Sequence, residues 1–412
     1  MSEEEAESTE EAAEVGEDAP KPKKKKKKEK KEEVVKLSPQ QQKKIDRQAT
    51  QENVREAVNK EFGEGTSFKA VDQDYKYIPR ISSGSFLMDY ALGGGWPRGR
   101  IILCWGARSS SKTTSCKRAV ADAQKRDIYS NRYLHTLSEE ELEHAIPMSC
   151  AWVDIEGTFD FAWAEQIGIN LSELEYAIPS SHEQAVDIVQ AYVKSGAYDV
   201  IVVDSLAASS HESELGAAAA DKDIGMAARL NNKMFRKVQS ELNNIMKLER
   251  ALTPTVFFVN QMRQSIGFGG GGKVKPGGNG QDFFSSVEVF FWSTAPDYFD
   301  ETKKLPKTIG FGFKVEKNKV SPPKIQGEYR QSLGDHPKGQ WKLGEVIESK
   351  EVMEFAKKLG MYHEIEDKSK KTWVLNGEEF SKKMDLNDKW VADRQKFGEL
   401  KQMMLKKLFP KN

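Results

Sequence analysis

The sequence predicts an α/β protein with a mainly parallel sheet, an N-terminal helical arm and a small α+β domain at its C-terminal end. Four continuous apolar runs, rich in β-branched residues, recur along the chain with helical stretches between them. Continuous runs, unlike alternating ones, are typical of parallel strands that are covered on both faces. The first run ends at a glycine, and a loop and a helix follow it, which is the order that a phosphate loop requires.

Composition and cysteine usage narrow the class of protein. A chain of 412 residues can bury a large core, and 38% hydrophobic with 31% charged residues is typical of a soluble protein. No apolar run approaches the roughly 20 residues that span a bilayer, and the acidic N-terminus lacks the apolar stretch of a secretory signal. Cys104, Cys116 and Cys150 are too scattered for a disulfide framework or a metal site. We therefore expect an intracellular protein.

Residues 1–36 form a tail of two opposite charge blocks, "MSEEEAESTEEAAEVGEDAP" and "KPKKKKKKEKKEE". Neither block has enough apolar residues to offset the entropy of ordering, so we expect disorder. The lysine block either binds DNA phosphates, serves as a nuclear address or only solvates the chain. We hypothesise that the acidic block folds back and competes for whatever the lysines bind.

The elements after the tail follow in chain order. Residues 37–63 have the pattern of a polar helix with a thin apolar stripe, so we expect this helix to pack on a partner or on the next subunit. A helical stretch follows the phosphate-type loop, and residues 127–147 look like an insertion. A glycine-rich loop, 267–280, comes after the last apolar run, and glycine at this density favours mobility until a ligand orders it. The four predicted strands lie within 100–106, 149–160, 198–208 and 253–263.

These elements group into four segments. We expect the disordered tail at 1–36, an oligomerisation arm at 37–66, the α/β core at 67–338 and the small domain at 339–412.

The loop "GARSSSKTT", residues 106–114, is close to the phosphate-loop pattern G-x-x-x-x-G-K-[ST]. Backbone N–H groups of residues 107–113 would cradle phosphates at the helix N-terminus. Lys112 would reach the β- and γ-phosphates, and the Thr113 hydroxyl would bind Mg²⁺. Ser111 stands where the pattern has its second glycine. Because a strained backbone costs about 1–3 kcal/mol, we expect binding to survive and leave the hydrolysis rate open.

Polar residues follow three of the predicted strands at their carboxyl ends, where ligands bind in open α/β sheets. Asp204 fits the acidic residue that holds the water around Mg²⁺. Glu156 is a candidate general base for an attacking water, and Gln261 is a candidate sensor of the γ-phosphate, next to Asn260. Each residue alone is more often a turn or cap residue. Their conjunction on the expected elements indicates a nucleotide site.

The assembled motifs resemble the RecA family of homologous-recombination proteins, from about residue 53 to the C-terminus. The stretches that match successive family motifs, in the family's order, are "KEFGEGTSF", "ISSGSFLMDYALGGGWPRGRI", "GARSSSKTT", "WVDIEGTFD", "DVIVVDSLAA", "GMAARLNNKMFRK", "FFVNQMRQSIG", "GGNG" and "KVEKNKVSPP". The resemblance implies the RecA-like core fold of P-loop nucleotide hydrolases. The long charged N-terminus and the insertion look like those of a divergent, phage-encoded member.

The resemblance implies roles for further residues. Asp160 and Trp163 match positions that contact adenine, and Lys317 and Lys319 match lysines that reach the nucleotide of the neighbouring subunit, so that ATP lies at a filament interface. Loops at 209–225 and 263–283 correspond to two DNA-binding loops. The implied nucleotide-loop contacts are Gly106, Ala107, Arg108, Ser109, Ser110, Ser111, Lys112, Thr113 and Thr114. The implied DNA contacts are Gly225, Arg229, Arg236, Arg263, Ile266, Gly277, Gly278 and Asn279.

Besides Ser111, three positions depart from the family pattern that the resemblance implies. Arg108 stands where an acidic residue is common and adds positive charge near the phosphates. Asp282 and Glu288 replace basic residues that couple subunits in bacterial members. These two departures leave the coupling between neighbouring ATP sites open for this chain.

The resemblance implies a DNA-dependent ATPase that uses ATP and Mg²⁺, forms helical filaments on single-stranded DNA and promotes pairing with homologous duplex DNA. Single-strand-binding and mediator proteins are candidate partners, with no membrane involved. The expected location is the cytoplasm, at the nucleoid or in a phage-infected bacterium. The alternative is an ATP-switched DNA-binding filament protein with little hydrolysis, which Ser111 favours and which Glu156, Lys317 and Lys319 oppose. A hexameric helicase fits less well because both DNA loops match recombinases.

Overall fold

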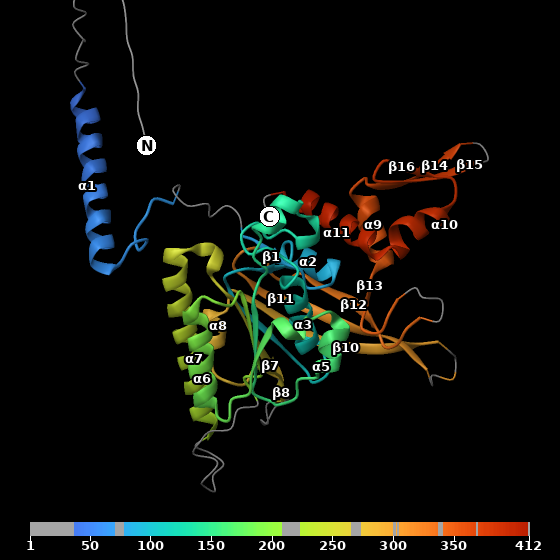
Figure 1. The fold of residues 1–412 in the computed structure, drawn as a ribbon, viewed down its shortest axis with the longest axis horizontal. Coiled ribbons are helices and arrows are strands. Elements are labelled where there is room, and N and C mark those ends of the chain that lie inside the picture. The colour runs from blue at the N-terminus through green and yellow to red at the C-terminus, as the bar shows by residue number, and fades with distance from the viewer. Residues whose placement is uncertain are drawn as a thin grey trace, which may run out of the picture. The chain divides into compact units, whose positions relative to one another are not determined.

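The computed structural model describes residues 37–70, 78–207, 223–264, 273–299, 302, 305–336, 341–367 and 370–410 (Figure 1). Its contacts divide the chain into two units, Met1–Ala57 and Val58–Asn412. The first unit holds most of helix α1 (Pro39–Phe62), which has no buried residue. The helix predicted at 37–63 is thus present, whereas the predicted tail at 1–36 lies outside the described residues. None of the helices in the described ranges is long and apolar enough to cross a membrane.

A nine-stranded sheet forms the centre of the second unit, in the order β13-β12-β11-β10-β3-β7-β6-β4-β5. Six neighbouring strands run parallel to one another, from β10 to β5, and the other three continue the sheet antiparallel. The strands are β3 (Ile101–Gly106), β4 (Cys150–Asp154), β5 (Leu174–Ala177), β6 (Val200–Asp204), β7 (Thr255–Gln261), β10 (Val287–Tyr298), β11 (Pro306–Asn318), β12 (Gln326–Ser332) and β13 (Val346–Ile347). The mainly parallel α/β core predicted from the sequence is confirmed.

Helices cover both faces of this sheet, as the continuous apolar runs require. The helices are α2 (Phe86–Leu92), α3 (Lys112–Ala123), α4 (Glu139–Glu143), α5 (Phe161–Ile167), α6 (His182–Ser195), α7 (Asp223–Leu248), α8 (Gly280–Phe284), α9 (Ser349–Lys358), α10 (Lys383–Leu386) and α11 (Arg394–Leu408). Alternate side chains of β3 point to opposite faces. Cys104 packs in one core cluster with α3, whereas Leu103 packs in a second cluster with α6 and α7.

Three short pairings lie outside the large sheet. β1 (Arg80–Ile81) pairs with β2 (Trp96–Pro97), and β8 (Arg263–Gln264) pairs with β9 (Lys273–Val274), both antiparallel. A third sheet joins β14 (Tyr362–Asp367), β15 (Lys370–Leu375) and β16 (Glu378–Phe380).

The C-terminal residues have a core cluster of their own, made by α9, α11 and the β14–β16 sheet. Phe86 of α2 belongs to this cluster. The buried Glu348 carboxylate accepts hydrogen bonds from Ser85 Oγ (2.9 Å) and from Lys401 Nζ of α11 (3.1 Å). These α and β elements agree with the predicted small α+β part, and the boundary at residue 338 stays a prediction.

Candidate functional site

The loop from Gly106 to Ser111 connects β3 to α3, and its backbone adopts conformations that favour glycine. Gly106 has φ 151°, and a Cβ there would overlap the carbonyl oxygen of Phe291 on the adjacent strand β10. Ser109 has φ 54°. Helix α3 begins at Lys112, so the loop presents N–H groups at a helix N-terminus, where anions are stabilised.

Ser111 precedes α3 with φ 70° and ψ 15°, the left-handed conformation that the glycine of the pattern would adopt freely. Its side chain makes no hydrogen bond to the helix backbone. Instead, Ser111 Oγ accepts a hydrogen bond of 3.0 Å from the Tyr329 hydroxyl, which is buried and lies 3.2 Å from Ser115 Oγ. Tyr329 is a residue that no sequence motif indicated, because its strand, β12, was not among the predicted ones.

Lys112 is buried, and its Nζ donates a 2.5 Å hydrogen bond to the Ala107 carbonyl oxygen of the same loop. Ser110 Oγ donates to the same oxygen at 2.8 Å. Burial lowers the pKa of the Lys112 ammonium, and the nearby carboxylates of Asp204 and Glu156 oppose this shift. The ammonium thus has a neutral oxygen as its partner within the loop, and a phosphate oxygen is a stronger partner for it.

Thr113, in the first turn of α3, contacts Asp204, the last residue of β6. Thr113 Oγ1 donates a 2.8 Å hydrogen bond to Asp204 Oδ2. Burial raises the pKa of Asp204 to about 7, with further contributions from the charges of Glu156 and Asp154, and the Thr113 hydrogen bond opposes the rise. A buried carboxylate beside a hydroxyl fits Mg²⁺, which takes oxygen ligands and is usually shared with substrate phosphates. In the described ranges no group of three or more His, Cys, Asp and Glu residues could hold a metal ion.

Glu156 lies in the turn after β4, which the Asp154 carboxylate fixes by accepting from the backbone N–H groups of Gly157 (2.9 Å) and Phe159 (2.8 Å). Glu156 Oε1 accepts two hydrogen bonds of 2.5 Å, from Gln261 Nε2 and from Ser205 Oγ. Glu156 follows β4, Ser205 follows β6 and Gln261 is the last residue of β7. Their hydrogen bonds therefore show that the three strand ends predicted to carry the site meet.

Asp160 and Trp163 lie beside the first two turns of α3. Asp160 caps α5 by accepting from the Trp163 backbone N–H at 2.9 Å, and Lys117 Nζ donates to its carbonyl oxygen at 2.9 Å. Trp163 Nε1 donates to Thr114 Oγ1 at 3.4 Å, and the indole packs against Gly344. The indole is thus tied to the last residue of the loop.

Lys317 and Lys319 lie on and just after β11 and contact their own subunit. Lys317 Nζ donates to the Asp282 carbonyl oxygen and lies 3.5 Å from Glu288 Oε1, while Lys319 Nζ donates to the Phe283 carbonyl oxygen at 3.3 Å. Lys275 Nζ also pairs with Glu288 Oε2 at 2.8 Å and with the Asp282 carboxylate. Asp282 and Glu288, which depart from the family pattern, thus form one cluster with Lys275 and Lys317.

The predicted DNA-binding loops are described in part. Residues 208–222 and 265–272, with Ile266, lie outside the described ranges, and the Arg263 side chain is not described. Gly225, Arg229 and Arg236 lie along α7, and both arginines are exposed.

The turn at Gly277, Gly278 and Asn279 packs against the same helix, α7. Gly277 (φ 98°) and Gly278 (φ 81°) adopt left-handed conformations. A Cβ at Gly277 would lie 2.5 Å from Asn231 Nδ2, and one at Gly278 would lie 3.2 Å from the Ala228 Cβ. Asn231 is fully buried, and neither of its amide atoms has a hydrogen-bond partner among the described residues. The turn thus packs on α7, the helix that also carries Arg229 and Arg236.

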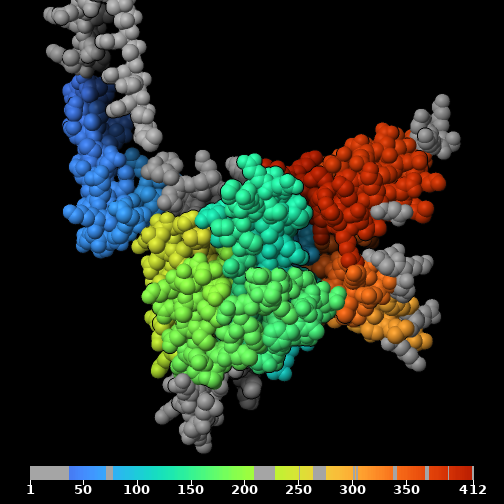
Figure 2. Space-filling view, viewed as in Figure 1, coloured from blue at the N-terminus to red at the C-terminus, as the bar shows by residue number. Residues whose placement is uncertain are grey.

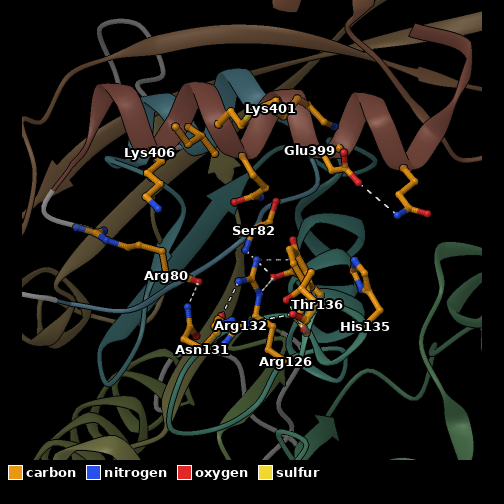
Figure 3. A pocket seen from close by; sticks show the side chains of 18 of the residues that line it. Arg80, Ser82, Arg126, Asn131, Arg132, His135, Thr136, Glu399, Lys401 and Lys406 are labelled. Atoms are coloured by element: carbon orange, nitrogen blue, oxygen red, sulfur yellow. Dashed lines mark hydrogen bonds and ion pairs between the residues drawn. The ribbon is translucent and has the colours of Figure 1, made fainter. Parts of the chain in front are cut away.

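A separate cavity of about 1210 Å³ lies away from the loop, between residues 126–136 and α11. In Figure 2 the turquoise surface that contains residues 127–147 adjoins the red C-terminal part. Figure 3 shows Glu399, Lys401 and Lys406 of α11 on one side and Arg126 and Arg132 on the other.

The charges around this cavity are largely paired. Arg126 pairs with Asp122 at 2.7 Å, Arg132 with Glu141 at 2.5 Å and Lys401 with Glu348 at 3.1 Å. No residue of the 106–114 loop lines the cavity. We therefore place the candidate nucleotide site at the loop and not at this cavity.

Comparison with known proteins finds similar sequences over most of the chain. A family model described as the RecA N-terminal domain matches residues 48–334. Protein RecA of Pseudomonas fluorescens (strain SBW25) is 33% identical over 340 residues, which cover 82% of this chain and 84% of that protein. Protein RecA of Oceanobacillus iheyensis is 33% identical over 323 residues, with 77% and 83% covered. Protein RecA of Campylobacter fetus subsp. fetus is 33% identical over 341 residues, with 82% and 88% covered.

Proposed function

This chain belongs to the RecA family, and we infer from that membership that it is an ATP-dependent recombinase of homologous recombination and DNA repair. The family carries DNA-dependent ATPase activity, ATP binding, single-stranded DNA binding and filament formation. The assignment of these activities to particular residues of this chain is our proposal. The alternative, a filament protein that binds ATP as a switch and barely hydrolyses it, is not favoured.

We propose that the 106–114 loop binds ATP in spite of Ser111. Lys112 would exchange its contact with the Ala107 carbonyl for the β- and γ-phosphates, since a charge-assisted hydrogen bond to a phosphate is stronger than the bond to a neutral oxygen that it replaces. Thr113 and Asp204 would hold Mg²⁺, which neutralises charge between the β- and γ-phosphates when bound. Asp160 and Trp163 would flank the adenine.

Glu156 would act as the general base of hydrolysis. Its carboxylate is half-buried, and Ser205 and Gln261 orient it through hydrogen bonds to a single oxygen, Oε1. Its other oxygen, Oε2, has no hydrogen bond to the described residues and is available to a water. Gln261 starts the segment that leads to the second DNA loop, so a change in its contact would pass from the ATP site to that loop.

DNA would bind along α7 and the turn that packs on it. Arg229 and Arg236 would pair with phosphates, together with Arg263, and the Gly277–Asn279 backbone would contact the strand without reading its bases. Ile266 would insert between bases, and Gly225 would allow the backbone to approach. Homologous duplex DNA, further copies of this chain and single-strand-binding or mediator proteins are the proposed partners, in a cytoplasmic setting.

The observation that carries this proposal is the convergence of Lys112, Thr113, Glu156, Asp204 and Gln261 at the carboxyl ends of β3, β4, β6 and β7. A strand-exchange assay tests the function. Circular single-stranded DNA and homologous linear duplex are mixed with the full chain, ATP and Mg²⁺, and the joint molecules are resolved on a gel. We expect joint molecules with homologous duplex and none with heterologous duplex. Their absence in both reactions would contradict the recombinase function.

A further inference from the structure

Arg108 follows Gly106 by two positions in the nucleotide loop, and its side chain is exposed. Its Nε donates a 3.3 Å hydrogen bond to Gln261 Oε1. The same glutamine amide donates through Nε2 to Glu156 Oε1 at 2.5 Å. The Gln261 amide therefore links Arg108 to the Glu156 carboxylate, which would activate water. Arg108 also belongs to the loop that would hold the phosphates.

The rest of the Arg108 guanidinium is available to a ligand. A guanidinium has five N–H donors in a planar fork, and the one at Nε makes the single hydrogen bond of this group to the described residues. Arg108 makes no ion pair in the described ranges, although Glu156 lies beyond the bridging amide. Planar forks of this kind match phosphate oxygens with two parallel hydrogen bonds.

The proposed site has two cations, the Lys112 ammonium and the Mg²⁺ that Thr113 and Asp204 would hold, and Arg108 adds a third. Asp204 and Glu156 both face Lys112, whose ammonium is the buried positive charge of the loop. Phosphoryl transfer spreads negative charge over the γ-phosphate oxygens, which needs nearby cations for its stabilisation.

We propose that Arg108 is a catalytic residue that binds the γ-phosphate of the ATP held by its own subunit. In the step it serves, the water oxygen forms a bond to the γ-phosphorus while the bond from that phosphorus to the β–γ bridging oxygen breaks. Glu156 takes the proton of the water, and ADP leaves with the bridging oxygen and its electron pair. Arg108 neutralises charge on the transferred group, while Gln261 orients the guanidinium. This inference rests on the proposed nucleotide site and adds a residue to it.

Equilibrium binding tests the contact without any turnover. The full-length chain and its Arg108→Ala variant are titrated with a non-hydrolysable ATP analogue and with ADP, in the presence of Mg²⁺. We expect the variant to lose about tenfold or more in affinity for the analogue, since charge-assisted hydrogen bonds contribute strongly, and less than about twofold for ADP, which lacks the γ-phosphate. Equal losses for both ligands, or no loss, would overturn the proposal. The retained ADP affinity also shows that the variant is folded.

Turnover on single-stranded DNA tests the catalytic role. We expect Arg108→Ala to lower kcat by about a thousandfold, the lower end of the roughly 10³–10⁵ contribution of arginines that contact transferred phosphoryl groups. Arg108→Lys keeps the charge without the fork and should recover part of the loss. Arg132→Ala is the matched control, because it removes an exposed arginine that pairs with Glu141 outside the site. A kcat of Arg108→Ala equal to that of Arg132→Ala would overturn the role.

Mixed filaments decide whether Arg108 acts on its own subunit's ATP. Lys112→Ala subunits, which retain Arg108 but lose the loop lysine, are mixed with Arg108→Ala subunits at constant total protein. Action within a subunit predicts that the mixture hydrolyses ATP no faster than the sum of its parts. Faster hydrolysis would mean that Arg108 reaches across the interface and would overturn this proposal. The native chain could also prove inactive in ATP hydrolysis while Arg108→Ala still weakens binding of the ATP analogue and not of ADP. That result would contradict the proposed hydrolysis and leave the contact of Arg108 with the γ-phosphate in place.

Discussion

The Tyr329 hydroxyl of β12 donates a 3.0 Å hydrogen bond to Ser111 Oγ, although the two residues are 218 positions apart in the chain. Ser111 holds a left-handed backbone, φ 70°, at the position where the loop pattern has glycine. The strained residue is thus tethered by a buried partner from the neighbouring antiparallel part of the sheet. This contact explains how the loop keeps its conformation without its second glycine.

Tyr329→Phe should destabilise the loop because it leaves the Ser111 hydroxyl without its donor. We expect the free energy of unfolding to fall by about 1 kcal/mol, the usual contribution of such a hydrogen bond. A double-mutant cycle with Ser111→Ala, measured by urea unfolding, should give a coupling of about 0.5–1.5 kcal/mol between the two positions. Ser111→Gly is the control, since glycine adopts this backbone without strain. Strictly additive effects of the two changes would refute the tether.

Glu156→Gln should abolish proton transfer while it preserves the geometry of the turn. A glutamine Oε1 can still accept from Ser205 and Gln261, so the fold should be unaffected. We expect kcat for ATP hydrolysis on single-stranded DNA to fall by about 10²–10⁴, the contribution typical of a general base, with ATP affinity unchanged. Steady-state kinetics together with nucleotide titration checks this. A kcat close to that of the wild type would assign the base elsewhere.

Gly277→Ala should impair DNA binding because a Cβ there would lie 2.5 Å from Asn231 Nδ2 in a backbone with φ 98°. The turn would have to move off α7, and we expect the affinity for a fluorescent single-stranded oligonucleotide to fall about tenfold, as loss of phosphate contacts does. Gly196→Ala is the matched control, since Gly196 is also left-handed (φ 64°) but has nothing within 4 Å of its Cβ position. Equal affinities of the two variants would contradict the role of the turn.

Asp89→Asn should change the pH dependence of stability. Burial raises the pKa of Asp89 from 3.8 to about 7, although hydrogen bonds from Ser82 and Ser83 oppose the rise. Between these values the folded chain binds a proton that the unfolded chain has lost. The contribution of Asp89 to stability is therefore complete below about pH 4 and is lost as the pH rises through about 7.

Asparagine mimics the neutral acid at every pH, so the variant should lose less stability than the wild type between about pH 5 and pH 8. A pKa that is higher by one in the folded chain than in the unfolded chain corresponds to about 1.4 kcal/mol. Urea unfolding of the wild type and the variant at pH 5 and pH 8 measures how much unfolding free energy each loses. Other buried acids such as Asp199 contribute equally to both proteins, so their effect cancels in the comparison. Parallel pH profiles would show that Asp89 is ionised in the folded protein.

The sequence was sufficient to predict the parallel strands of the sheet and the 106–114 loop. Strands such as β6 (Val200–Asp204) are buried on both faces, so their apolar runs are unbroken and end at the polar residues of the site. The antiparallel strands gave a weaker signal. In β11 (Pro306–Asn318) apolar residues alternate with glycine and charged residues, and β12 (Gln326–Ser332) is mostly polar, so neither strand has a continuous apolar run.

Contacts between segments that lie far apart in the chain could not be predicted from local sequence patterns. Tyr329 reaches Ser111 from another strand, and no local pattern marks either partner of that bond. The same holds for Glu288, whose pairing with Lys275 and Lys317 depends on the approach of β10, β11 and the segment before α8. The resemblance assigned the role of Lys317 by position, whereas its partners within the subunit follow from the fold.

Hydrolysis of ATP with and without single-stranded DNA tests the central claim most directly, with Lys112→Ala as the control that removes the loop ammonium. The account predicts turnover that rises with added single-stranded DNA and is lost in Lys112→Ala, because the serine-containing loop binds and splits ATP. An unstimulated or absent turnover in the native chain, restored by Ser111→Gly, would contradict it and would mean that the loop binds ATP without cleaving it.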